Sequence, residues 1–82
     1  MKEKVRLAAA LSFDAKKDHA PRVTASGEGQ LASAIMKTAS LHNIPVKKDP
    51  VLASMLLSVP RGSEIPENLY KIVAAIFATI YR

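Results

Sequence analysis

The chain has 82 residues, a formal net charge of +5 and no cysteine. This length allows a single domain with a small core. The absence of cysteine excludes disulfides, thiolate metal sites and a cysteine nucleophile. Apolar residues make up 49% of the chain and charged residues 23%, which is typical of a folded protein. We therefore expect one domain over residues 1–82.

Basic residues are scattered along the chain rather than gathered on one predicted helix face. The adjacent pairs are Lys16 with Lys17 and Lys47 with Lys48. A scattered excess is typical of a solvated surface. Nucleic-acid binding needs basic residues clustered with aromatic ones, and the aromatic residues here fall on or beside apolar stripes. No nucleic acid is expected as a partner, although a small basic domain that binds nucleic acid or an acidic surface stays the alternative.

No segment is long enough to be a signal peptide or a membrane span. The apolar run at residues 7–11 is shorter than the roughly 7–15 residues of a signal peptide core. The C-terminal run at residues 72–80 is shorter than the about 20 residues that cross a bilayer. A soluble, cytoplasmic protein is expected.

Alternating apolar positions predict a β-strand over residues 7–13. Its larger, deeply buried face would carry Val5, Leu7, Ala9, Leu11 and Phe13. Its other face has small side chains, which suit a closely packed helix. A second strand, expected to be antiparallel to the first, starts near Pro21 and continues through Val23 and Ala25 until Gly27 and Gly29 end it.

A helical pattern begins at Gln30. Its predicted inward stripe and flanking positions are Leu31, Ile35, Ala39 and His42, with Ala32 and Met36 beside them. Asn43 stands where a left-handed residue ends a helix, and Pro45 prevents its continuation. Residues 44–46 then predict a short third strand.

Asp49 and Pro50 are typical of a helix start, because Asp caps free backbone N–H groups and Pro suits the first helical position. The inward positions of this short helix are Leu52, Met55, Leu56 and Val59. A last helix begins at Pro66 and Glu67. Its apolar stripe consists of Leu69, Ile72, Val73, Ile76, Phe77 and Ile80.

These elements follow one another in the order β-β-α-β-α-α. A helix between the second and third strands would make a right-handed crossover. The predicted fold class is therefore α/β, a small mixed β-sheet with helices packed around it.

One motif suggests a nucleotide site and is better explained by structure. Gly27, Gly29 and Ala32 have the spacing of a dinucleotide fingerprint between a predicted strand and helix. However, Glu28 would place a negative charge beside the pyrophosphate, and the chain is too short for a doubly wound sheet. We interpret the glycines as the turn from strand to helix.

The sequence also offers no catalytic or metal constellation. His19 and His42 are the histidines, and neither has a nearby pair of ligands for a metal ion. No serine lies in a nucleophile-elbow context. The expectation is a protein that is not an enzyme and that uses no metal and no cofactor.

Segments of specific sequence stand in a fixed order along the chain. They are AALSFD at 9–14, APRVTASGEG at 20–29, NIPVKKDPVLASML at 43–56 and SEIPENLYKIVAAIFATIYR at 63–82. In this order and spacing they resemble the cytoplasmic domain of the FlhB/YscU-like family, the export switch proteins of type III secretion. The resemblance covers residues 7–82. It implies a small α/β sheet domain with surrounding helices.

Members of that family typically carry membrane helices ahead of this domain and an Asn-Pro-Thr-His loop before its first strand. In those family members the backbone breaks at the Asn–Pro bond of this loop, because the Asn side chain cyclises. Here the matching positions hold Glu3, Lys4, Val5 and Arg6. Because the cyclising Asn and the Pro are replaced, we expect a free-standing counterpart of the fragment after the cleavage point, without the membrane part and without self-cleavage.

The resemblance also implies where the domain binds. A shallow apolar patch of the family domain is proposed to receive early export substrates, and its positions match Ala20, Pro21, Ala74 and Phe77 here. Ala75 stands where relatives commonly have an acidic residue. Packing is the other explanation for these residues, since Phe77 belongs to an apolar stripe and Pro21 begins a strand. Whether Phe77 is core or surface is left open.

The function implied by the resemblance is a non-catalytic protein-binding module of flagellar or type III protein export. It would dock on export-gate components or export substrates, and associate with the membrane export gate through protein contacts. It would substitute for the cleaved C-terminal fragment of the membrane-bound switch protein.

Overall fold

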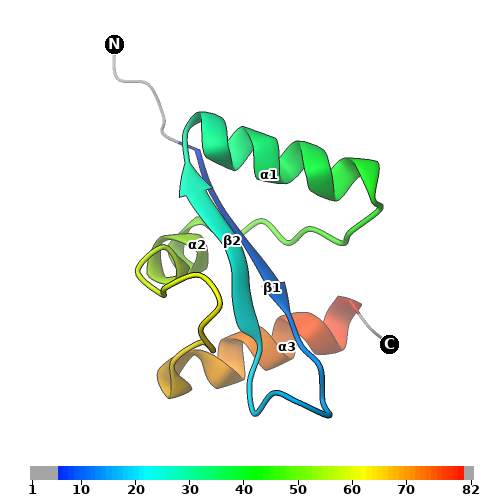
Figure 1. Ribbon diagram of the computed structural model, residues 1–82, viewed down its shortest axis with the longest axis vertical. Helices are drawn as coiled ribbons and strands as arrows, with labels where there is room; N and C mark the ends of the chain where they lie inside the picture. The colour runs from blue at the N-terminus through cyan, green and yellow to red at the C-terminus, as the bar shows by residue number, and fades with distance from the viewer. Residues whose placement is uncertain (1–5, 81–82) are drawn as a thin grey trace.

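A β-hairpin runs through the molecule, with helices placed along it (Figure 1). The computed structural model describes residues 6–80. Its elements are β1 (Leu7–Ser12), β2 (Arg22–Glu28), α1 (Gln30–Leu41), α2 (Pro50–Leu56), the 3-10 helix η1 (Glu67–Leu69) and α3 (Tyr70–Ile80). Helix α1 lies near one end of the hairpin and α3 near the other (Figure 1). The predicted α/β class, with helices packed around a sheet, is confirmed.

The two strands are antiparallel, as predicted. Leu7 lies opposite Glu28 and Ser12 opposite Arg22, with a β-bulge between Ala10 and Leu11. A bulge bends and twists the strand that carries it, so the far end of the hairpin changes direction. Phe13 follows the end of β1 and is 47% exposed, so the predicted larger face is not deeply buried over its whole length.

The predicted third strand at residues 44–46 is wrong, and so are the mixed sheet and the crossover that depended on it. The sheet has two strands in the described part of the chain. Pro45 has no N–H to give to a ladder, and Ile44 and Val46 are 52% and 54% exposed. Apolar character without burial or pairing does not make a strand.

Residues 62–65 provide the extra pairing instead. They run antiparallel to the start of β2: Val23 N donates to Ser63 O at 3.0 Å and Ile65 N donates to Pro21 O at 2.8 Å. Gly62 begins this segment with a φ of 91°, a backbone conformation that glycine adopts without strain. The pairing brings the chain that leads into α3 against the hairpin.

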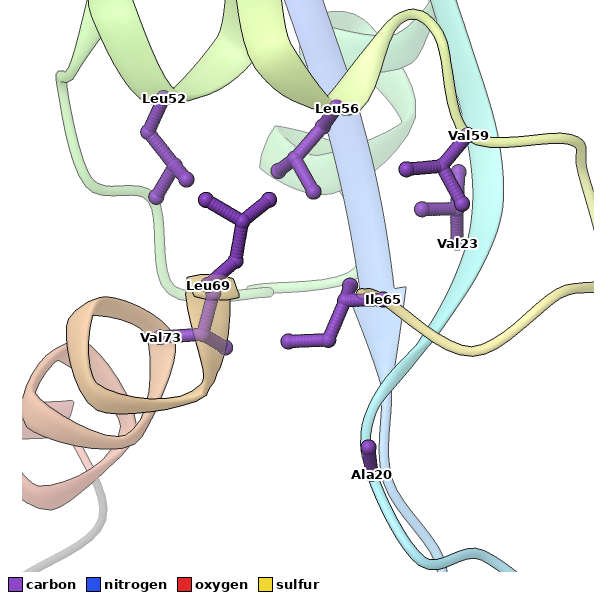
Figure 2. Packing of buried hydrophobic residues seen from close by; sticks show 8 residues of the cluster. All are labelled: Ala20, Val23, Leu52, Leu56, Val59, Ile65, Leu69 and Val73. Carbon is purple, nitrogen blue, oxygen red and sulfur yellow. The ribbon is translucent and has the colours of Figure 1, made fainter. Parts of the chain in front are cut away.

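A cluster of apolar side chains between the hairpin, α2 and α3 forms the core (Figure 2). Its members are Ala20, Val23, Leu52, Leu56, Val59, Ile65, Leu69 and Val73. Figure 2 shows the side chains of Leu52 and Leu56 directed from α2 toward that of Leu69. Burying one such leucine or valine contributes about 1.5–3 kcal/mol, so this cluster dominates the stability of the domain.

Helix α1 packs through small residues. Ala32 and Ala39 are buried, Ala8 of β1 is buried as well, and α1 contacts both strands. Small side chains let the helix lie close to the hairpin, as the small face of the first strand suggested. The inward face of α1 differs from the predicted one, because Leu31 is 56% exposed and Met36 is 43% exposed.

Leu31 was expected to face the core and lies over a glycine instead. A Cβ added at Gly27 would overlap the Leu31 side chain. The leucine therefore packs on the backbone of β2 at a position where only glycine leaves room. Met55 and Ile72 were also predicted to point inward, and they are 41% and 42% exposed.

The predicted start of α2 and end of α1 are confirmed, whereas the last helix begins with the 3-10 turn η1 at Glu67 and becomes α-helical at Tyr70. The Asp49 Oδ1 atom accepts a hydrogen bond from Leu52 N at 3.0 Å, and Pro50 occupies the first position of α2. Asn43 has a φ of 55° after the end of α1. Each residue satisfies or redirects backbone groups that a helix end leaves free.

Replacing the cap should weaken α2. Asp49→Ala removes the acceptor for Leu52 N, and we expect a loss of about 0.5–2 kcal/mol in the free energy of unfolding. Urea denaturation followed by circular dichroism measures it, with Lys48→Ala as the neighbouring control. Equal stability of the two variants would show that the cap contributes nothing.

The orientation of α2 gives a second test. Leu56 is 3% exposed and Met55 is 41% exposed, although they are adjacent. Leu56→Ala leaves a cavity and should lower the free energy of unfolding by about 2–5 kcal/mol. Met55→Ala should change it by about 0.5 kcal/mol or less, as at other surface sites. A comparable loss in both variants would contradict this packing.

Candidate binding groove

The residues that the sequence singled out line one groove. Ala20 and Pro21 stand between the hairpin loop and β2, and Ala74 and Phe77 stand on α3. They face a shallow hollow of about 530 Å³. Its full lining is Phe13, His19, Ala20, Pro21, Tyr70, Ala74, Phe77 and Ala78. Segments far apart in the sequence therefore meet there, and we call this hollow the groove.

The groove residues differ in exposure. Ala20 is 2% exposed, while Ala74 is exposed. Phe77 is half-buried: it packs against the core cluster and also lines the groove. The alternatives of core and surface for Phe77 are thus both true of different parts of its ring.

A second hollow adjoins the first. It has a volume of about 370 Å³ and is lined by Leu11, Ser12, Phe13 and Phe77. Because the two hollows share Phe13 and Phe77, the apolar surface continues from α3 to the end of β1. Exposed aromatic side chains are typical of protein-binding surfaces.

The sequence reasoning missed several lining residues. Tyr70 and Ala78 are four residues before and after Ala74 on α3, so helical spacing alone would have added them. Phe13 and His19 come from the hairpin loop. No sequence pattern places that loop against α3, because its position depends on the pairing of residues 62–65.

A charged cluster lies behind the groove. Arg22 Nε is 2.6 Å from Asp18 Oδ1, and Arg22 Nη2 is 3.4 Å from Glu64 Oε2. Arg22 Nη1 also donates to the carbonyl of Gly62 at 2.9 Å. The Asp18 side chain is 7% exposed although its residue lies in a loop. Its carboxylate is therefore covered at the surface of the fold by specific partners.

The partners of Asp18 shift its titration. A hydrogen bond from the backbone N–H of Asp14 and then the hydrogen bond from Arg22 lower the pKa of Asp18 below its ordinary value. The same pair raises the pKa of Arg22. The Asp18 carboxylate is accordingly ionised, and paired, at neutral pH.

The groove has a mainly apolar lining. Its polar side chains are those of His19 and Tyr70, and its other lining residues are apolar. Within residues 6–80, no group of three or more His, Asp or Glu side chains is placed to hold a metal ion. No helix in that part of the chain is long and apolar enough to cross a membrane.

The glycine motif at the end of β2 has a structural role. Gly29, with a φ of 65°, joins β2 to α1, and Gly27 makes room for Leu31. Asp49, which completed the nucleotide-like spacing, caps α2. The turn from strand to helix accounts for these residues.

Comparison with known families decides the class of this domain. The family described as FlhB HrpN YscU SpaS Family matches residues 4–80. The chain belongs to this family. Membership supports a role in flagellar or type III protein export, and the resemblance of the ordered sequence segments is confirmed.

Individual relatives are consistent with membership of this family. The chain is 42% identical to the uncharacterised protein YlqH of Bacillus subtilis, over 100% of this chain and 90% of that protein. It is 41% identical to the flagellar biosynthetic protein FlhB of Aquifex aeolicus, over 90% of this chain. The chain spans 21% of the length of that FlhB.

Solved structures show the same fold. The cytoplasmic domain of FlhB from Shewanella putrefaciens superposes with a TM-score of 0.89 and 31% identity, covering 93% of this chain and 64% of that one. A point-mutated EscU C-terminal domain gives a TM-score of 0.87 and 28% identity, with 93% of each chain covered.

The titration of Asp18 predicts acid sensitivity. Because its pKa is lowered in the folded state, its pairing stabilises the fold above the unfolded pKa of about 4 and is lost as the pH falls through the folded value. Asp18→Asn lacks this contribution at every pH. The difference in urea midpoint between the parent and this variant should be largest at neutral pH and should shrink below about pH 4. A difference in urea midpoint that does not change with pH would show that Asp18 is not the source of the acid sensitivity.

Proposed function

We propose that this chain is a non-catalytic protein-binding module of the flagellar or type III export apparatus. Its groove, with Ala20, Pro21, Ala74 and Phe77, would dock on export-gate components or on export substrates. The observation that carries the proposal is that these residues line one apolar groove in a member of this family.

The physical argument rests on exposed apolar surface. Phe13 is 47% exposed and Tyr70 is 40% exposed at opposite sides of the groove, one on the hairpin and one on α3. Covering such side chains removes apolar area from water and stabilises a complex. Ala74 and Ala78 are short, so side chains of a partner find room between the aromatic rings.

The module would act without cleaving itself. Cleavage by cyclisation requires the side-chain amide nitrogen of an Asn, and Glu3 has none. Residues 3–5 lie outside the described part of the chain. Arg6, the last residue of the matching stretch, accepts a hydrogen bond from Gly29 N through its carbonyl at 2.9 Å. An intact mass that stays unchanged on incubation at neutral pH supports this part of the proposal, and a break between Glu3 and Lys4 contradicts it.

The expected place of action follows from the family. The module would associate in the cytoplasm with the membrane export gate through protein contacts, and would substitute for the cleaved C-terminal fragment of the membrane-bound switch protein. Complementation of a switch protein truncated after its cleavage point is the direct assay. Export that returns when this chain is supplied supports the proposal, and a chain that restores none contradicts it.

The net charge of +5 favours a second candidate, a domain that binds nucleic acid or another acidic surface. Titration against labelled RNA and DNA at low salt tests it, because phosphate contacts give affinity that falls steeply with salt. No binding, or binding without that salt dependence, would exclude it.

A charge placed in the groove should block docking. Ala74→Glu puts a carboxylate among apolar side chains, where a bound partner would have to desolvate it. We expect export in the complementation assay to fall by about tenfold or more. Ala75→Glu is the matched control, since Ala75 is exposed on α3 but does not line the groove.

Circular dichroism and the melting temperature show whether both variants are folded. Export that falls equally in the two variants, or that stays at the parent level in Ala74→Glu, would contradict docking through the groove.

A further inference from the structure

One wall of the groove lacks regular secondary structure. His19, Ala20 and Pro21 line the groove and lie between the end of β1 and the start of β2, in a stretch that forms neither strand nor helix. Backbone pairing holds the end of this wall, where the Pro21 carbonyl accepts from Ile65 N at 2.8 Å, and Ala20 packs in the core cluster. The start of the wall, at His19, is held by other contacts.

The residues on either side of this wall in the sequence form an ion pair. Asp18 precedes it and Arg22 follows it, and their side chains meet with Nε and Oδ1 2.6 Å apart. The pair closes a short loop around residues 19–21. Asp18 Oδ2 also accepts from the backbone N–H of Asp14 at 3.0 Å, so the start of the hairpin loop is tied to the same carboxylate.

The other groups of Arg22 tie the wall to the segment that leads into α3. Its Nη1 donates to the Gly62 carbonyl at 2.9 Å and its Nη2 approaches Glu64 Oε2 at 3.4 Å. The same Glu64 oxygen accepts from the backbone N–H of His19 at 3.2 Å. The planar guanidinium uses its separate N–H groups on three partners at once, which the single ammonium of a lysine cannot reproduce.

We propose that Arg22 is a positioning residue for the groove. Resting on the function proposed above, this inference adds that Arg22 fixes the wall of His19, Ala20 and Pro21 against α3 and so presents the groove already formed. Arg22 does not line the groove itself. A wall that is ordered before binding avoids the entropic cost of ordering it on binding, so the residue raises affinity without touching the partner.

Breaking the cluster should therefore change the groove more than the core. Val23 and the other members of the core cluster are buried among apolar neighbours, whereas the Arg22 side chain is 40% exposed. The backbone N–H groups of Asp14 and His19 depend on it through Asp18 and Glu64. Arg22→Gln should loosen residues 14–21 and leave the protection of core amides in place.

The experiment uses the absence of cysteine from the chain. Ala74→Cys, labelled with an environment-sensitive fluorophore, reports on the groove, and hydrogen exchange reports on the amides of Asp14 and His19. In Arg22→Gln we expect emission shifted to longer wavelength and exchange of these amides about tenfold faster. Arg22→Lys should fall between the parent and Arg22→Gln.

Arg61→Gln is the matched control. It removes the same charge next to Gly62, from an exposed arginine without a hydrogen bond or ion pair in the described structure. If Arg22→Gln does not fold, Glu64→Gln provides the second variant, since it weakens the link between the wall and residues 62–64. Equal emission and exchange in the Arg22 or Glu64 variant and in Arg61→Gln would overturn the inference.

Export separates this inference from the proposed function. If Arg22 positions a groove that the apparatus uses, Arg22→Gln lowers complementation by about tenfold and Arg61→Gln does not. If Ala74→Glu leaves export unchanged, the proposed function fails, yet the fluorophore and the exchange rates still decide whether Arg22 holds the wall.

Discussion

The pairing of residues 62–65 with the start of β2 is the contact on which the remaining structure depends. Three backbone hydrogen bonds between Pro21, Val23 and this segment hold the chain that enters η1 and α3 against the hairpin (Figure 1). Ile65 is thereby buried beside Val23, and the core cluster closes around the two. Without this pairing, β2 would have no backbone partner on its side away from β1 in the described part of the chain.

The same contact makes the groove. It sets α3 beside the hairpin loop, so that Ala74 and Phe77 face Ala20 and Pro21 across a shallow hollow. In a small domain the core is small, so many side chains are partly in the core and partly at the surface. Phe77 illustrates this, since part of its ring packs on the core cluster while the rest lines the groove. Under the proposed function, binding and stability would share Phe77, so small substitutions at exposed Ala74 would separate them better than changes at Phe77.

Local signals in the sequence predicted local structure well. The cap at Asp49, the left-handed turn at Asn43 and the two antiparallel strands all follow from residues close together in the chain. Wrong predictions concern which apolar residues find a partner. Residues 44–46 have strand-like composition but pair with neither strand of the described sheet, and Leu31 packs over Gly27 rather than in the core. Such outcomes depend on tertiary neighbours, which a period of apolar residues does not specify.

The groove residues were predicted from the resemblance and not from any pattern in the chain. Spacing on one helix relates Ala74 to Phe77, but nothing in the sequence relates either to Ala20, because a long stretch of chain separates them. The segment at residues 62–65 links α3 to the hairpin in the structure. Its strand-like pairing could not be predicted, because these residues have no alternating apolar pattern. Phe13 lines both hollows. The alternating pattern predicted it as a strand residue, because nothing local shows that it lies near α3.

The electrostatics of the cluster behind the groove show how the site persists at neutral pH. The pKa of Asp18 is lowered by Asp14 and Arg22, so its carboxylate stays ionised and paired far above the acid range. Arg22 remains charged as well, since Asp18 raises its pKa further. Protonation of the Asp18 carboxylate therefore does not break its pairing with Arg22 near neutrality. Occupancy of the groove would be governed by the concentration of its partner and by the apolar area that the partner covers, which suits a docking surface.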